Sequence, residues 1–511
     1  MMPGSGTGGV LIASMLIAAT AAALYAPAAH FELTGDDYQL MQLAKMASHS
    51  PTTVLSAEGQ FRPLVIATLI TDRALWHQRS GGYHLTNLVL HVVCGIGLLT
   101  VALRLGLGVL PAAVLSLLWT LSPFGVESAV WVSARSDTML AICWFLIILL
   151  WPGPDRRFSA RRALAVITVA GAAVLTKESW VAMPILFVGL GIHGNDSQVR
   201  RWTLAATWSA IAALGYLAVR ITTGSGLPGQ IAISGHTLAK PFHTLAAFLF
   251  LEELRPIGYT LTWRGTIAVA VTAALCVSAY HARDRAGLVG AALFLAGILP
   301  TLPVSNLPHR YVVIAHAGFL LLFTSWAART IVAIAARYRK ASQIMIGVAV
   351  ALVALADCAM VRADLVDWRR VSNAYTVLLQ QTRSIAQDLP SEGMVGVIRM
   401  ENHNPLAEIA SQPRGGWKLF FARQDDPSGL VDSAALLEWV IDREEIIVRT
   451  WTTSQIGSIP GYAVAHTEGG FVWLCKPCSD LGQVMSEVNR SGYRSRIVRI
   501  ARIDDDARWV P

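Results

Sequence analysis

The feature that most constrains this chain is a series of long apolar segments that recurs between residues 9 and 361. A helix needs about 20 apolar residues to cross the hydrocarbon core of a bilayer, and several segments approach that length. Charged residues make up 14% of the 511 residues, against about 25% in an ordinary soluble domain. The sequence therefore predicts an α-helical polytopic membrane protein.

Hydropathy predicts about eleven spans, and the basic residues predict their orientation. The first span lacks the basic start of a signal peptide, so we expect it to stay uncleaved. Cytoplasmic connections carry the excess of lysine and arginine. Every inner connection is basic if 241–260 lies along the membrane, whereas a crossing by 241–260 would move Arg283 and Arg285 outward. The predicted spans are 9–27, 84–104, 108–122, 137–151, 162–176, 180–193, 202–221, 265–281, 287–303, 310–328 and 343–361.

The composition changes near residue 363, which predicts two domains, 1–362 in the membrane and 363–511 outside it. Helical periodicity in the second part predicts helices at 371–388, 430–441 and 480–490. Strand-like runs occupy 394–400, 417–422, 445–451, 471–475 and 496–502. We therefore expect a C-terminal soluble α/β domain on the non-cytoplasmic side. No residue pattern in this domain indicates its role.

Charge and cysteine content narrow the classes of partner. The net charge is +8, but much of the excess lies in the predicted cytoplasmic loops, and no basic run interleaved with aromatic residues indicates nucleic-acid binding. Cys94, Cys143, Cys276 and Cys358 stand singly in apolar segments and are typical of small core residues. Cys475 and Cys478 are too few for a four-ligand zinc site, which leaves a redox pair or, in an exported domain, a disulfide.

Polar residues gather in the loops that the topology places on the outer face. Carboxylates and cations meeting at a lipid–water boundary suit an anionic lipid headgroup together with a general base. Arginine matches phosphate oxygens in pairs, and lysine acts as a point charge. The candidate residues are Asp36, Asp37, Glu127, Asp137 and Glu178, the cations Arg135, Lys177 and Arg310, and His309.

The order of these motifs resembles the GT-C superfamily of membrane glycosyltransferases. The motifs are DD at 36–37, FRPL at 61–64, GYHLTNLVLH at 82–91, SPFGVESAVWVSARSD at 122–137, LTKES at 175–179 and PVSNLPHRY at 303–311. The resemblance covers about 10–370 and is greatest to the protein O-mannosyltransferase-like group. That group includes the transmembrane part of the O-mannosyltransferases that carry tetratricopeptide repeats, which this chain lacks.

The resemblance implies an inverting transfer of a sugar from a polyprenyl-phosphate-linked donor at the outer face. It implies that Asp36 is the general base and that Asp37 orients Asp36 or shares its role. It also implies that Arg135, Lys177 and Arg310 bind the donor phosphate. Glu127, Asp137, Glu178 and His309 are possible substrate contacts. A phosphomonoester is an adequate leaving group, so no metal or other cofactor is required, although a divalent metal is not excluded.

The chain departs from the family pattern at three positions. Ser122 and Gly125 stand where the family has histidines, and His309 stands where it has glutamate. The departures leave open whether the sugar is mannose, whether the acceptor is a glycan, a lipid or a protein, and whether a metal binds that loop. The Arg-rich cytoplasmic loops and the compact tail favour a bacterial inner membrane, with the site and the C-terminal domain on the periplasmic side.

Other interpretations of the same residues stay open. The two aspartates could be the solvated start of a helix, Arg135 and Asp137 a capping pair, and Lys177 and Glu178 a salt bridge within a turn. The stripe of His84, Asn87 and His91 on one helix face is more typical of hydrogen bonds between helices than of a ligand site. The competing functions are a transporter or flippase for lipid-linked glycans and a membrane-anchored assembly factor.

Overall fold

The structure is a computed structural model in which the chain divides into two compact units, each described by itself. It describes residues 5–51, 61–152, 159–191, 235–252, 261–304, 309–386, 393–399, 446–452, 462–467, 470–475, 500–503 and 509–510, with residues 209, 215, 436, 439 and 440. The helical unit comprises Met1–Ala29, Thr52–Thr68 and His84–Leu365. The sheet unit comprises His30–Pro51, Leu69–Tyr83 and Val366–Pro511.

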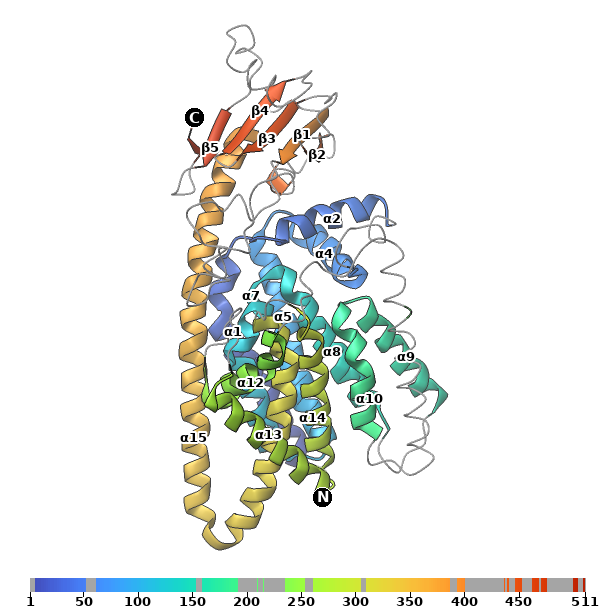
Figure 1. Cartoon of the computed structure of the whole chain (residues 1–511), viewed down its shortest axis with the longest axis vertical. Helices are drawn as coiled ribbons and strands as arrows, with labels where there is room; N and C mark the ends of the chain where they lie inside the picture. Colours follow the sequence, from blue (N-terminus) through green and yellow to red (C-terminus); the bar gives the residue numbers. More distant parts are fainter. Residues whose placement is uncertain are drawn as a thin grey trace. The chain divides into compact units, whose positions relative to one another are not determined.

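Long apolar helices make up most of the described chain (Figure 1). The helices are α1 (Ser5–Tyr25), α2 (Asp37–His49), α4 (Pro63–Trp76), α5 (Ser80–Arg104), α6 (Val109–Leu121), α7 (Val126–Val130), α8 (Arg135–Leu150), α9 (Ala160–Val174), α10 (Met183–Gly191), α12 (Gly235–Phe250), α13 (Trp263–His281), α14 (Arg285–Ile298) and α15 (Val313–Ala386). Short 3-10 turns join several of them, among them Glu178–Ala182 and His309–Val312.

Six stretches of helix are long and apolar enough to cross a membrane among the described residues. They are Thr7–His30, Ser80–Arg104, Val132–Leu150, Trp263–His281, His309–Ile331 and Ile344–Asn373, and the bent pair Val109–Leu121 with Pro123–Val130 would make a seventh. The chain is thus a helical multi-pass membrane protein, as the hydropathy predicts.

The other predicted spans correspond to shorter elements or lie outside the described residues. The helices α9, α10 and α14 occupy the predicted spans 162–176, 180–193 and 287–303. Segment 202–221 lies outside the described residues except for 209 and 215. Helix α12 ends at Phe250, and the part of 241–260 beyond 252 lies outside them as well. The count of eleven spans stays a prediction.

A sharp bend separates α6 from α7. Pro123 lacks the backbone N–H that would continue the helix, so α6 ends at Leu121. Ser122 caps the turn that follows, its Oγ accepting from the backbone N of Phe124 at 3.3 Å. The two helical pieces diverge by 57°, and the bend places Glu127 of α7 where its Oε2 accepts from the backbone N of Arg310 at 3.2 Å.

Arginines gather at one end of the helical unit. Arg104 at the end of α5 donates to the carbonyl of Trp151 after α8 at 3.2 Å, and Arg285 of α14 donates to that of Pro152 at 3.3 Å. Arg329 of α15 pairs with Asp284 at 3.3 Å. The described loop ends that carry these residues therefore lie together, which agrees with their assignment to one side of the membrane. Which side of the membrane they face stays a prediction.

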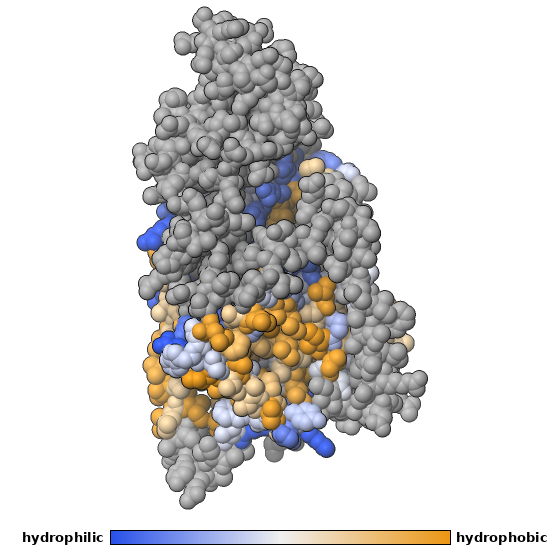
Figure 2. Space-filling model, in the orientation of Figure 1, coloured by the Kyte–Doolittle hydropathy of each residue, from blue (hydrophilic) through white to orange (hydrophobic). Residues whose placement is uncertain are grey.

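Apolar side chains cover the outside of the helical unit as well as its interior. Figure 2 shows hydrophobic residues gathered over the helices, with hydrophilic residues along the lower rim. Figure 1 shows α15 reversing direction between its two apolar spans. In the second span, Ile344, Met345 and Leu352 are more than half exposed. Because large exposed apolar faces are rare in water-soluble proteins, this surface fits contact with lipid.

Helices α14 and α15 approach each other closely through glycine. A Cβ at Gly290 would lie 2.6 Å from the backbone N of Leu322, and one at Gly318 would meet the backbone N of Phe294 and the carbonyl O of Gly290. Backbone atoms cannot move aside as a flexible side chain can. At these two positions the helix contact therefore leaves no room for a side chain larger than the hydrogen of glycine.

We expect Gly318→Ala to lower the free energy of unfolding by about 1–3 kcal/mol, because the added methyl overpacks the α14–α15 contact. The matched control is Gly347→Ala on the second span of α15, where an added Cβ meets no atom within 4 Å. The measurement is the thermal midpoint of the purified protein in detergent. Equal midpoints for the two variants would contradict the close packing described here.

The sheet unit contains one mixed sheet. Its strands are β1 (Gly393–Arg399), β2 (Ile446–Thr452), β3 (Tyr462–Thr467), β4 (Gly470–Cys475), β5 (Ile500–Ile503) and β6 (Trp509–Val510), in the order β2-β1-β3-β4-β5-β6. Strand β1 pairs in parallel with β2 and β3, and the remaining pairs are antiparallel. The strands β1, β2 and β4 lie where the sequence predicts strands, β5 overlaps the predicted run 496–502, and β3 was not predicted. The run 417–422 lies outside the described residues.

The sheet unit also includes 30–51 and 69–83, which the sequence analysis placed in the membrane domain. The contacts that hold the first of these segments come from the end of α15. The hydroxyl of Tyr375 accepts from the backbone N of Gly35 at 3.0 Å, and the Tyr375 ring stacks on that of Tyr38 at 6.0 Å. The Oγ of Ser372 accepts from the backbone N of Glu32 at 2.9 Å. The boundary at 362 was predicted from local composition, which does not reveal contacts between residues so far apart in the sequence.

Candidate active site

Cations and carboxylates pair at the end of the helical unit opposite to the basic loops. The helices α5, α8 and the first part of α15 each run from this end toward the arginine-rich end. Each member of the cluster lies at or beside the start of a helix or turn, where the chain enters the bundle. We call these residues the paired-charge cluster; they are Arg62, Glu127, Asp137, Lys177, Glu178 and Arg310.

Arg62 and Glu178 form the most exposed of these pairs. The guanidinium donates to Glu178 Oε2 from Nε at 3.2 Å and from Nη2 at 3.0 Å. It also donates from Nη1 to Ser136 Oγ at 3.3 Å. The side chains are 13% and 27% exposed, so both reach solvent. The sequence analysis missed Arg62 as a site residue; its signal is the FRPL motif, whose Pro63 begins α4.

Lys177 and Asp137 form the most deeply buried pair. The Lys177 ammonium donates to Asp137 Oδ1, and the two side chains are 5% and 7% exposed. Lys177 Nζ also lies 4.5 Å from the centre of the Tyr311 ring. Burial lowers the pKa of the ammonium to about 8, even though Asp137 raises it, and the charges of Arg62 and Arg310 lower it further. Burial thus opposes the charged form of Lys177, and the contact with Asp137 favours it.

Arg310 is held by a carboxylate and two aromatic rings. Its Nη1 lies 3.7 Å from Glu127 Oε2, which also accepts from the Arg310 backbone N at 3.2 Å. The guanidinium carbon lies 4.2 Å from the Trp131 ring centre and 5.0 Å from that of Tyr311. These contacts orient a charged group that is 13% exposed.

Arg135, the third predicted phosphate ligand, lies deeper than the other two. It is 0% exposed and donates from Nε to Asn87 Oδ1 at 2.9 Å and from Nη1 to Thr68 Oγ1 at 3.1 Å. The guanidinium thereby ties α8 to α4 and α5. Its binding of phosphate stays a prediction, and the observed contacts are those of a group that positions the helices.

The polar stripe on α5 makes the hydrogen bonds between helices that the sequence favours. His84 Nδ1 donates to the carbonyl of Val130 at 2.7 Å, with the tautomer set by that bond, and Asn87 Nδ2 donates to that of Trp131 at 2.8 Å. His91 Nε2 lies 3.1 Å from the carbonyl of Thr120. These bonds fasten the α6–α7 bend to α5 and so support the cluster.

His309 begins the turn that carries Arg310 and is buried in an aromatic group. Its ring packs edge to face against Phe124 at 5.9 Å, and Phe124 packs in the same way against His316 at 5.0 Å. The role of His309 as a substrate contact stays a prediction.

Asp36 and Asp37, in the sheet unit, differ in environment. Asp37 is 0% exposed, and its Oδ2 accepts from the backbone N of Thr34 at 2.9 Å. Asp36 is exposed and immediately precedes α2. Gly35 before it has φ +56°, a left-handed conformation that suits glycine. The buried acid fixes the turn, and the exposed acid faces solvent. The catalytic roles of both acids stay predictions.

Two further predictions concern the cysteines and the need for a metal ion. Cys94, Cys143, Cys276 and Cys358 are free thiols, buried or half-buried. Cys478 lies outside the described residues, so its disulfide with Cys475 stays a prediction. Within the described ranges no group of three or more His, Cys, Asp or Glu could hold a metal ion. The independence from metal stays a prediction too.

Comparison with known proteins identifies a solved structure with a similar fold. No family model matches the sequence, and no curated protein matches it. The crystal structure of ArnT from Cupriavidus metallidurans bound to undecaprenyl phosphate matches 90% of this chain and 93% of its own, with a TM-score of 0.51 and 15% identity. The chain has the fold of ArnT. At this identity the likeness to ArnT extends to the fold alone, and it agrees with a multi-pass helical membrane protein.

Proposed function

We propose that this chain is a GT-C-type glycosyltransferase that uses a polyprenyl-phosphate-linked sugar. The observation that carries the proposal is the shared fold with ArnT, whose crystal structure contains undecaprenyl phosphate. The order of the sequence motifs and the paired-charge cluster support it independently. In the proposed topology eleven spans hold the site at the outer face of a bacterial inner membrane, with a soluble α/β domain on the same side.

The reaction is a direct displacement that inverts the anomeric carbon. Asp36 takes the proton from the acceptor hydroxyl, whose oxygen forms a bond to that carbon while the bond from the carbon to the phosphate oxygen breaks. The sugar moves to the acceptor, and the polyprenyl phosphate leaves as a monoester. Asp37 keeps the turn before α2 in shape and thereby orients Asp36.

The leaving phosphate gains negative charge as its bond to the sugar breaks, so cations that face it lower the barrier. Lys177 and Arg310 have this role in the proposal, and Arg62 joins them. Their carboxylate and aromatic partners hold them ready before the donor arrives. Arg135 positions α4, α5 and α8 beneath them. The identities of the sugar, including mannose, and of the acceptor stay open.

The test is donor consumption in membranes that contain the full chain. A radiolabelled polyprenyl-phosphate sugar should be consumed, with label appearing in an acceptor, only where the chain is expressed. Membranes from the same host without the chain are the control for endogenous transferases. Loss of the donor from one leaflet without chemical change would favour the lipid-linked glycan flippase and contradict the transferase.

A further inference from the structure

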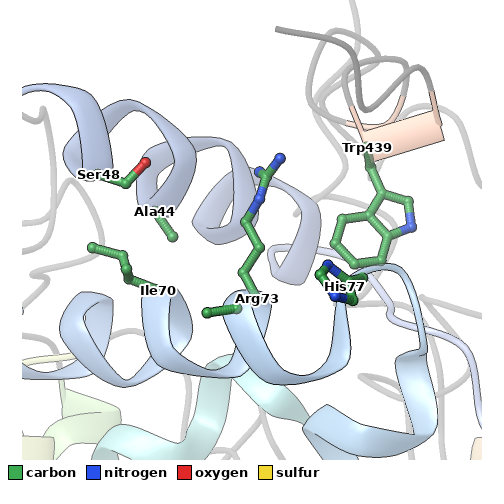
Figure 3. Close-up of a pocket in the computed structure, with 7 residues that line it drawn as sticks. Ala44, Ser48, Ile70, Arg73, His77 and Trp439 are labelled. Atoms are coloured by element: carbon green, nitrogen blue, oxygen red, sulfur yellow. The ribbon is translucent and has the colours of Figure 1, made fainter.

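A pocket with no assigned role lies within the sheet unit. Its volume is about 340 Å³, large enough for one or two sugar rings, and Figure 3 shows the side chains around it. It opens between α2 and the second half of α4 and is closed at one end by an indole from the C-terminal part of the chain. The lining residues are Ala44, Ser48, Ile70, Arg73, Ala74, His77 and Trp439.

The aromatic wall of the pocket is fixed from behind. The carbonyl of Trp439 accepts from Gln78 Nε2 at 2.7 Å. The indole packs edge to face on Tyr83 at 5.8 Å and on Tyr38 at 6.3 Å, and both tyrosines are 0% exposed. A ligand that meets this indole therefore meets a preorganised surface, which reduces the entropy lost on binding.

His77 has an unusual backbone at the same end of the pocket. Its φ is +52°, a left-handed conformation that non-glycine residues rarely adopt. The hydroxyl of Tyr83 donates to the His77 carbonyl at 2.8 Å and holds the turn in place. His77 directly follows α4, and its backbone N donates to the carbonyl of Arg73 at 2.9 Å, so this is the left-handed residue that ends the helix and fixes the imidazole at the pocket. Figure 3 shows the His77 ring beside the indole of Trp439, with Arg73 extending from α4 toward α2.

The chemistry of the lining selects the class of ligand. An indole suits the apolar face of a sugar ring, while the imidazole and the Ser48 hydroxyl suit its hydroxyl groups. The guanidinium of Arg73 matches a carboxylate or phosphate, and the lining residues that the structure describes include no acid. We propose that this pocket binds an acidic saccharide, a sugar ring that carries a carboxylate or a phosphate.

The site does not depend on the transferase activity, but its role rests on the proposed function. If the chain transfers a sugar to an acceptor glycan, a saccharide pocket outside the paired-charge cluster is where part of that acceptor binds. The acceptor would then be an anionic glycan. The two proposals are tested separately, because the pocket predicts binding of a free sugar and the transferase activity predicts consumption of a lipid-linked donor.

The test is calorimetric titration of the purified full chain in detergent with glucose 6-phosphate and with glucuronate. Glucose, inorganic phosphate and glycerol 3-phosphate are the comparison ligands. We expect the acidic sugars to bind more tightly than all three, and Arg73→Gln to weaken them by about 10- to 100-fold, as loss of a charge-assisted contact does. Arg79→Gln is the matched control, because Arg79 is exposed and lies outside the pocket.

A second variant guards against a change in folding. His77→Asn keeps a side chain that tolerates the left-handed backbone and removes the imidazole, so it should weaken the acidic sugars while leaving the thermal midpoint unchanged. If glucose bound as tightly as the acidic sugars, the pocket would not select an acidic saccharide. If inorganic phosphate or glycerol 3-phosphate bound as tightly, the pocket would be a site for anions or lipid headgroups instead. Donor consumption without sugar binding would remove this site and leave the proposed function standing. Sugar binding without donor consumption would do the reverse.

Discussion

Asp36→Asn should slow donor consumption by about 10²-fold or more, the contribution typical of a positioned general base. The amide that replaces the carboxylate cannot accept the proton of the acceptor hydroxyl, while its size is nearly unchanged. Asp36 is exposed at the start of α2, and surface substitutions of nearly equal size seldom destabilise, so the variant should fold normally. The measurement is the initial rate of donor loss at matched amounts of folded protein.

The control for Asp36 is its neighbour. Asp37→Asn retains an oxygen that can accept from the Thr34 backbone N, so its rate should fall less than that of Asp36→Asn. A larger loss for Asp37→Asn would transfer the role of base to Asp37. Wild-type rates in both variants would remove the first outward loop from the mechanism altogether.

Lys177→Met should lower the free energy of unfolding by about 3–5 kcal/mol, the usual cost of breaking a buried ion pair from one side. The variant leaves the Asp137 carboxylate buried at 7% exposure without its ammonium partner. The control is Arg264→Met, since Arg264 is 49% exposed and pairs with Glu252 near the surface. That pair should contribute at most about 1 kcal/mol.

A double variant separates folding from donor binding in this pair. Lys177→Met with Asp137→Leu removes both charges and should recover most of the lost stability, because apolar replacements of a buried ion pair are often neutral. Donor consumption should remain low, since the cation that faces the leaving phosphate is gone. If the double variant recovered both stability and activity, Lys177 would be a structural residue only.

Hydropathy predicts most of the spans because lipid imposes one requirement on every crossing segment, a long apolar run with its backbone bonded internally. The helices α1, α5, α8 and α13 lie within a few residues of their predicted limits. Where local chemistry intervenes, the prediction is less complete. The predicted span 108–122 matches α6, but no helix was predicted after Pro123, where α7 diverges from α6 by 57°.

The partners within the site could not be predicted, because they are distant in sequence. Arg62 pairs with Glu178 and Glu127 with Arg310, and no local pattern joins those positions. The sequence identified both of these carboxylates and Arg310 as charged residues of the outer loops but missed Arg62. It also could not distinguish Arg135, which is 0% exposed, from the cations that reach the surface.

The paired-charge cluster has three cations and three carboxylates among the residues that the structure describes. Such a group has almost no net charge, so its field decays quickly with distance and cannot draw a remote anion toward it. A lipid-linked donor would reach the site by lateral diffusion within the leaflet, and the cations would act only at contact range. The rate of donor capture should consequently depend on the fluidity and thickness of the bilayer far more than on ionic strength.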